Sequence, residues 1–248
     1  MNRSVIILGL GLVLNLVAQS AFSNEHLLKH AQAVSQAMSA LYMTSLSHGS
    51  DKYNRDLQFY KQTADESLLQ YVASQGPQHE ALNNAWQKIK NDIKVEYSED
   101  YEWDPDEVLR RDFRTYQSNA YQLISQQLDQ YRSAPLSVLL ASVQVETMIA
   151  RFFDVSTSYN GTISLSPIDA EKVDPKAISA QFNRAMDALV NRTQDAGLKK
   201  QINSALYKWK FIEDSVVNYS DESAHFLVYA TKNKIHKVLS QNQLVSAN

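Results

Sequence analysis

The sequence predicts an all-α fold: about eight helices that form one or more up-down helical bundles. Apolar residues recur at three- and four-residue steps along most of the 248-residue chain, which is the period of a helix with one buried face. No segment alternates apolar and polar residues as a half-buried strand does. One stretch, residues 135–155, is apolar on nearly every face, which is typical of a central bundle helix or of a membrane span.

Charged residues decide between these two interpretations of residues 135–155. Glu146 and Arg151 interrupt the apolar run, as does the polar Gln144. A charged side chain at the centre of a bilayer costs about 2.5–3.5 kcal/mol even on insertion-based scales. We therefore expect a buried bundle helix, and no stable membrane insertion of the mature protein.

The N-terminus predicts export. Arg3 precedes an apolar core, Val5 to Val17, of the length found in signal peptides. Two small-residue exits follow, Ala18-Gln19-Ser20 and Ala21-Phe22-Ser23, and the sequence leaves open which of them is cleaved. We take residues 1–23 as the signal peptide. An uncleaved anchor is the alternative, although the core is shorter than the roughly 20 residues that a span needs.

Composition narrows the location and the chemistry. The chain has no cysteine, which excludes a lipoprotein anchor, disulfide bonds, and cysteine-based metal, thiol or c-type haem sites. An exported protein of this size without disulfides suits the periplasm of a Gram-negative bacterium, so we predict a periplasmic or secreted protein. The formal net charge is −3, so we expect no nucleic-acid partner.

Four helices are predicted before the central one. Asn24 is a suitable N-cap for the first, and Gly76-Pro77 ends the second. Before the fourth, Asp104 and Pro105 form the usual start, a cap followed by proline at the first helical position. The predicted ranges are 25–47, 51–73, 78–95 and 105–131.

Three more helices are predicted after a loop from Ser156 to Asp174, in which the helical period fails. Asp174-Pro175 repeats the cap-and-proline start. A polar tail, residues 241–248, follows the last helix. The predicted ranges are 175–193, 196–218 and 221–240.

Residues 24–240 are expected to form one helical domain, within which a weak repeat suggests two halves. Gln58-Phe59 stands 28 residues before Trp86, and Gln181-Phe182 stands 28 residues before Trp209. Coincidence is the alternative, because aromatic residues are common on amphipathic helices. The halves would be 24–132 and 133–240, with the central helix opening the second.

The polar residues of the central helix are candidates for a ligand site. A charge on a buried helix must be paired or bound to something. Glu146 and Arg151 are five residues apart and point about 140° from each other on a helix, so we do not expect them to pair mutually. Either each pairs with a neighbouring element, or they and Gln144 form a polar site in which Arg151 holds a small anion or carboxylate.

An acidic, aromatic connector, Glu96 to Glu107, is the second candidate. A solvated loop is one interpretation, and a docking patch for a basic partner is another, since exposed aromatic residues beside charge often mark interfaces. Calcium is a third, although the spaced pattern of a calcium-binding hand is missing. The residues that would contact a protein partner are Glu99, Asp100, Tyr101, Glu102 and Trp103.

Metal and catalytic signals are incomplete. His26 and His30 project from one helix face, but zinc or copper needs further ligands. Glu222-x-x-His225 has the spacing used twice in di-iron bundles and occurs once here. No metalloprotease, serine-hydrolase or phosphate-loop motif is present, so we expect no cofactor and no enzyme. A metal protein or enzyme assembled from these scattered residues is the alternative.

Two stretches resemble the starts of the two copies in a known family. Residues 31–38, AQAVSQAM, and 141–148, ASVQVETM, stand where each copy would begin in the helical periplasmic sensor domains of the type IV pilus chemotaxis transducer and nitrate-sensor group. The resemblance implies a sensory helical bundle that binds a small ligand. The family's Gln-Arg-Met-Leu-Ser-Gln-Arg stretch is absent, and only Arg151 could replace its arginines as an anion contact.

The sequence therefore predicts an exported, non-enzymatic helical bundle that binds a small molecule or an envelope protein. A structural or assembly factor that acts through the acidic connector remains a further alternative.

Overall fold

The computed structural model describes residues 3–74, 76, 78–99, 102–157, 173–219 and 224–240, with side chains from residue 22 onward. In these ranges it contains eight α-helices and one short 3-10 helix, and no strand, which confirms the all-α prediction. The helices are α1 (Arg3–Leu46), α2 (Asp51–Ala73), α3 (His79–Asp92), α4 (Glu107–Ser125), α5 (Ala134–Ser156), α7 (Pro175–Arg192), α8 (Ala196–Asn218) and α9 (His225–Ser240).

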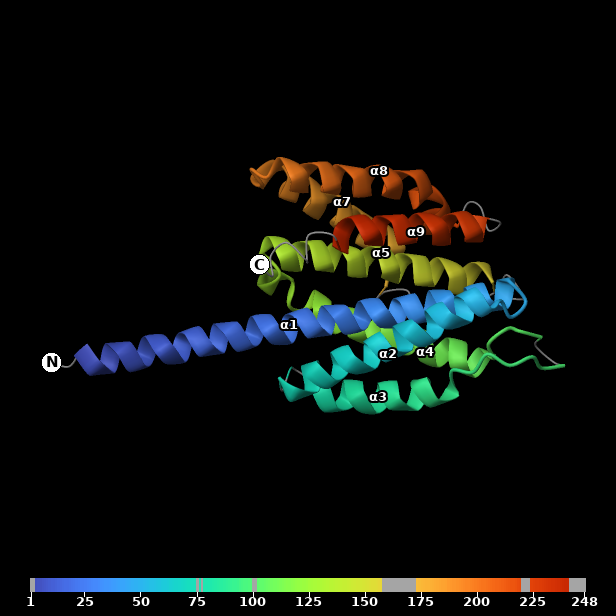
Figure 1. Ribbon diagram of the computed structural model, residues 1–248, viewed down its shortest axis with the longest axis horizontal. Helices are drawn as coiled ribbons and strands as arrows, with labels where there is room; N and C mark the ends of the chain where they lie inside the picture. The colour runs from blue at the N-terminus through green and yellow to red at the C-terminus, as the bar shows by residue number, and fades with distance from the viewer. Residues whose placement is uncertain are drawn as a thin grey trace.

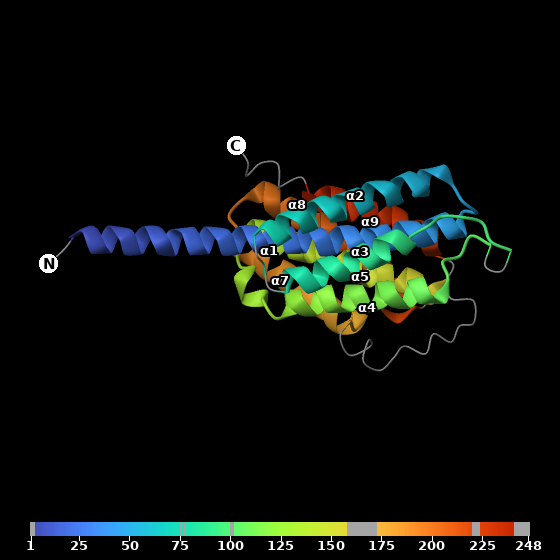
Figure 2. The ribbon, with the colours of Figure 1, turned by 90° about the horizontal axis from the view of Figure 1, so that it is seen from below.

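The first helix differs from its prediction. Helix α1 runs without a break from Arg3 to Leu46, and its N-terminal part projects beyond all other helices (Figures 1 and 2). Asn24 therefore lies inside the helix and does not cap it; its side chain donates a hydrogen bond to Gln130 Oε1 at 2.7 Å. The predicted cap was wrong because the preceding apolar segment continues the same helix.

The start of α4 also differs. The N-cap is Asp106, whose side chain accepts from the Leu109 amide at 2.8 Å, and not Asp104. Helix α4 ends at Ser125, and a 3-10 turn, Leu128–Gln130, takes the place of its predicted last turn. The cap predicted at Asp174 is confirmed, since its carboxylate accepts from the Lys176 amide at 2.9 Å.

The helices form two groups of four that meet along α1 and α5. Helices α1–α4 occupy the lower part of Figure 1, and α5, α7, α8 and α9 occupy the upper part. Helices α1 and α5 run parallel: Gln36 contacts Glu146, and further along both helices Tyr42 contacts Asp154. Whether the two groups derive from a repeat stays a prediction.

The residues that suggested the repeat behave differently in the two groups. Trp86 on α3 and Trp209 on α8 are both fully buried on the third helix of their group. Phe182 is also buried and packs edge-on against Trp209, whereas Phe59 is 65% exposed. The tryptophans therefore match in burial, although Trp86 Nε1 donates to Asp65 and Trp209 Nε1 has no hydrogen-bond partner among the described residues.

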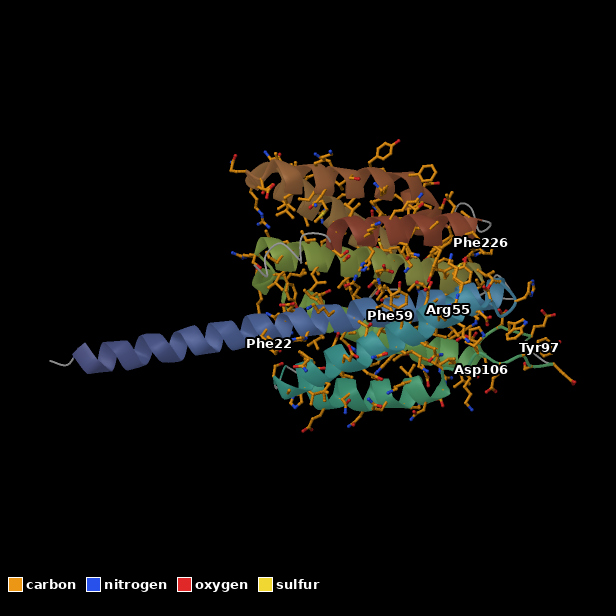
Figure 3. The ribbon with its side chains drawn as sticks, viewed as in Figure 1. Phe22, Arg55, Phe59, Tyr97, Asp106 and Phe226 are labelled. Atoms are coloured by element: carbon orange, nitrogen blue, oxygen red, sulfur yellow. The ribbon has the colours of Figure 1, made fainter. Side chains whose placement is uncertain are left out.

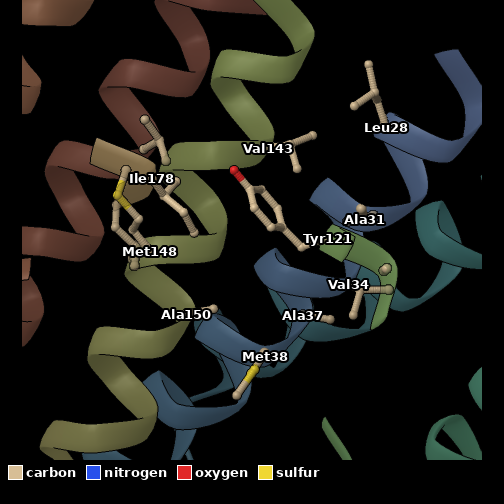
Figure 4. Close-up of a cluster of buried hydrophobic side chains, with 14 of the residues drawn as sticks. Leu28, Ala31, Val34, Ala37, Met38, Tyr121, Val143, Met148, Ala150 and Ile178 are labelled. Carbon is tan, nitrogen blue, oxygen red and sulfur yellow. The ribbon is translucent and has the colours of Figure 1, made fainter. Parts of the chain in front are cut away.

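Helix α5 is the buried centre of the molecule. Every residue from Val138 to Asp154 is buried. Within the described residues, α5 is the one helix that is long and apolar enough to cross a membrane. In the most apolar 18-residue window of α5, 89% is buried inside the protein, so the interpretation as a bundle helix is confirmed. Figure 4 shows Ala150 of α5 beside the turn of α1 that carries Ala37 and Met38.

The turn after α1 fits against the acidic connector. Gly49 has a φ of +82°, in the left-handed region that favours glycine. A Cβ at this position would lie 2.6–2.8 Å from three ring atoms of Trp103. The glycine therefore allows both the turn and the seating of the Trp103 ring.

We predict that Gly49→Ala destabilises the protein by about 2–4 kcal/mol, because it adds left-handed strain and displaces the Trp103 ring. Gly197→Ala is the matched control: Gly197 lies in the first turn of α8, and its nearest obstacle is one Asp195 oxygen at 3.1 Å. That control should change stability by less than about 1 kcal/mol. Urea unfolding would measure both; equal midpoints would contradict the contact between Gly49 and Trp103.

Candidate functional site

The three ligand residues predicted on α5 do not gather at one place. The Gln144 amide donates to Gln181 Oε1 at 3.0 Å and lies 3.5 Å from the Tyr121 hydroxyl. Glu146 and Arg151 each meet charged partners of their own, and not each other. The structure thus distributes these side chains over three separate polar contacts.

Glu146 lies in a buried group that we call the Glu146 cluster: Glu146, Lys232, Gln36, Tyr60 and Tyr229. Lys232 Nζ is 3.1 Å from Glu146 Oε2, and both residues are at most 1% exposed. Gln36 donates to the other carboxylate oxygen at 3.0 Å. The ammonium also lies 4.7 Å from the Tyr229 ring centroid and 5.4 Å from that of Tyr60, distances at which an aromatic face attracts a cation. Both buried charges are therefore compensated inside the protein.

Arg151 belongs to a second group, the Asp154 cluster: Asp154, Tyr42, Arg110, Arg114 and Arg151. Asp154 is fully buried and accepts from Tyr42 at 2.7 Å and from Arg151 Nη1 at 3.0 Å. Arg114 Nε lies at 3.4 Å and Arg110 Nη1 at 4.0 Å from its oxygens. Burial and the neighbouring carboxylate raise the pKa of Tyr42, so it remains a donor. Arg151 Nη2, in contrast, is buried without a hydrogen-bond partner.

Sequence reasoning missed Lys232, Asp154, Arg110 and Arg114. A signal for Lys232 was present, because it occupies the apolar stripe of α9 between Val228 and Ile235. A lysine on an apolar stripe predicts a buried acidic partner, and Glu146 on the most apolar helix is the acid that fits this prediction. The arginines gave no comparable signal, since both stand among polar residues of α4.

The acids of the connector divide into two sets. Asp104 accepts from Ser45 and lies 3.9 Å from Arg110, Asp106 caps α4, and Glu107 pairs with Arg114. Arg110 also donates to the Pro105 carbonyl at 3.1 Å and to Thr157 Oγ1 at 3.1 Å, which ties this end of the connector to α5.

The other set lies at the exposed tip. The Ser98 amide donates to the Glu102 carbonyl at 2.7 Å, which closes a short hairpin. Tyr97 is 61% exposed, projects from the end of the bundle (Figure 3), and meets the half-buried Trp103 ring edge-on at 5.8 Å. Of the predicted partner contacts, Glu99 and Glu102 are exposed, as is Glu96 nearby, while Asp100 and Tyr101 lie outside the described residues.

The two histidines of α1 do not share a site. His30 is fully buried, and both ring nitrogens are occupied: Nδ1 donates to the Ala64 carbonyl at 2.9 Å and Nε2 accepts from the Tyr116 hydroxyl at 2.6 Å. Burial lowers the pKa of His30 to about 4, so the ring is neutral. His26 packs against Phe22 instead. Within the described ranges, no three His, Asp or Glu side chains are grouped to hold a metal ion.

His225 pairs with Ser156, whose Oγ lies 2.8 Å from His225 Nε2. The serine hydroxyl also donates to the Phe152 carbonyl at 2.6 Å. A hydroxyl carries one proton, so His225 is then the donor to Ser156, the reverse of a general base that activates a nucleophile. Glu222 lies outside the described residues.

A shallow cavity of about 290 Å³ lies between α3 and α4. It contains no charged residue, and Tyr116, which holds His30, forms part of its wall. The lining residues are Gln78, Ala81, Leu82, Ala85, Tyr116, Asn119, Gln122, Leu123 and Gln126.

Comparison with known proteins gives no relative: no family model, no curated protein and no solved structure matches this chain.

We predict that Lys232→Met destabilises the protein by about 3–5 kcal/mol, because the Glu146 carboxylate is left buried and unpaired. The double variant Glu146→Gln, Lys232→Met should recover most of that loss, since neither charge then remains. Lys234→Met, an exposed position on the same helix, is the control and should change little. Urea unfolding of all variants would measure the coupling; additive single effects would contradict the buried pair.

We also predict a loss of stability in acid that depends on His30. Its pKa is about 4 in the folded protein and about 6.5 in the unfolded chain, so the unfolded state takes up the proton first. The contribution is complete above pH 6.5 and is lost as the pH falls towards 4, by about 3 kcal/mol in total. His30→Gln should show a flatter unfolding free energy over this window. Parallel pH curves for the two proteins would exclude His30 as the cause.

Proposed function

We propose that this protein is an exported, non-enzymatic helical bundle that binds another envelope protein through the tip of its connector. We define the connector tip as Glu96, Tyr97, Glu99, Glu102 and Trp103. Export is supported by the basic start, apolar core and small-residue exits at the N-terminus. Docking is supported by the division of the connector's acids between internal pairs and the exposed tip.

That division is the observation that carries the proposal. Asp104, Asp106 and Glu107 have partners within the fold, whereas Glu96, Glu99 and Glu102 form no ion pair with another described residue. The hairpin bond between Ser98 and Glu102 and the ring contact of Trp103 with Tyr97 hold the tip in one shape. A preordered surface loses less conformational entropy on binding.

The chemistry of the tip defines the partner. Three exposed carboxylates complement a surface rich in Lys or Arg, and such complementarity mainly speeds encounter and selects the partner. Tyr97 supplies the apolar area that interface centres usually take from aromatic residues. The partner is therefore expected to be a protein with a basic patch around an apolar recess, and binding should weaken with salt.

A small anion bound at Arg151 is the second candidate function, in line with the sensory role that the resemblance implies. The observation in its favour is Arg151 Nη2, which is buried and has no hydrogen-bond partner. Asp154 pairs with Arg151, and Glu107 and Asp104 lie against Arg114 and Arg110, so this candidate has less support than the connector tip.

Site-specific photo-crosslinking in cells tests the docking proposal. A benzophenone amino acid at Tyr97 should give a discrete adduct, whereas the same group at Tyr207, 79% exposed on α8, should not. Changing Glu96, Glu99 and Glu102 together to Lys should lower the adduct yield about tenfold, the equivalent of roughly 1.4 kcal/mol of binding free energy.

A control variant is needed to separate the position of the charges from the change in net charge. Glu66, Glu80 and Asp187 lie on other helices, and their joint change to Lys alters the net charge by the same amount. That variant should keep the Tyr97 adduct. An adduct that survives reversal of the tip, or that the control variant loses equally, would refute docking through the connector.

A further inference from the structure

The two small-residue exits at the N-terminus lie three residues apart, and the fold distinguishes them. Cleavage after Ser20 leaves Ala21 as the first residue, and cleavage after Ser23 leaves Asn24. Phe22 and Ser23, which lie between the two sites, both make contacts in the structure, so the two products would not fold with the same contacts.

The buried part of α1 begins at Ser23, one residue after Phe22, which is 48% exposed. Figure 3 shows Phe22 where α1 enters the bundle, and its ring meets His26 edge-on at 4.3 Å. Ser23 is 7% exposed, and its hydroxyl fills space beside Gly76, where a Cβ would come within 2.6 Å of it. Asn24 is 4% exposed and bonded to Gln130. Cleavage after Ser23 would remove two of these contacts and place the third at a chain end, where fraying competes with it.

Helix capping also favours cleavage after Ser20. The Ser23 hydroxyl is buried without a hydrogen-bond partner while α1 continues through it. Removal of the leader takes away the carbonyls that the next backbone amides use, and serine is among the best residues to cap such amides. A chain that starts at Ala21 keeps Ser23 for this purpose, and one that starts at Asn24 does not.

We infer that the leader is removed by hydrolysis of the Ser20–Ala21 peptide bond, and that the mature chain begins at Ala21. A membrane-bound leader endopeptidase would break this C–N bond. Water supplies the hydroxyl to the new carboxylate of Ser20 and a proton to the new amine of Ala21. The inference rests on the export part of the proposed function and is independent of docking at the connector tip.

Expression of the full chain in a Gram-negative host, followed by osmotic release of the periplasm, tests the inference. Intact mass and N-terminal sequencing should give Ala21 as the first residue. Asn24 as the first residue would overturn the assigned site and leave export intact. An uncut chain that stays with the membrane would overturn both cleavage and release.

Two phenylalanine variants make the test specific. Leader peptidases need small side chains at the last and third-last positions before the cut and accept any residue between them. Ser20→Phe should therefore accumulate precursor at least several-fold over the natural chain, whereas Gln19→Phe, one position away, should be processed normally. Normal processing of Ser20→Phe would also overturn the site.

Discussion

The parallel packing of α1 against α5 is the constraint on which the rest of the structure depends. Both helices are buried along most of their common length, so a polar side chain at this seam has no access to water. Glu146 and Asp154 are the two carboxylates of α5 in this position. Their partners come from α1, α4 and α9, and the two acids therefore connect the helix groups that the apolar contacts bring together.

Buried charge pairs of this kind add little net stability, because desolvation offsets much of the attraction. Their effect on arrangement is larger. Lys232 reaches Glu146 in one register of α9 against α5, and a shift by one helical turn would leave both charges unpaired. Apolar residues such as Val228 and Ile235 would tolerate such a shift better, since packing of aliphatic side chains is less directional. We interpret the Glu146 cluster as a device that fixes register.

Local patterns predicted the elements well where both ends carry a signal. Residues 51–73 and 196–218 were predicted with the boundaries that the structure has, since turn residues flank the first and Asp195 caps the second. Local patterns failed where the burial or pairing of a residue depends on another part of the chain. Phe226 and Leu227 are large apolar residues within the helix predicted at 221–240, yet they are 54% and 48% exposed. The pairing of Asp154 with Arg110 and Arg114 of α4 was equally hidden, because a contact between two helices leaves no local trace in the sequence.

The acids of the connector differ in whether the fold gives them a partner. An internal partner explains why Asp104, Asp106 and Glu107 are acidic, because each satisfies a hydroxyl, an amide or a guanidinium. No such need explains the tip, where neutral polar residues would close the hairpin equally well. Like charges held in one short hairpin repel each other, which raises the energy of the free protein. A basic partner would relieve that repulsion. The acidic composition of the tip therefore fits the proposed docking of a basic protein better than a role inside the fold.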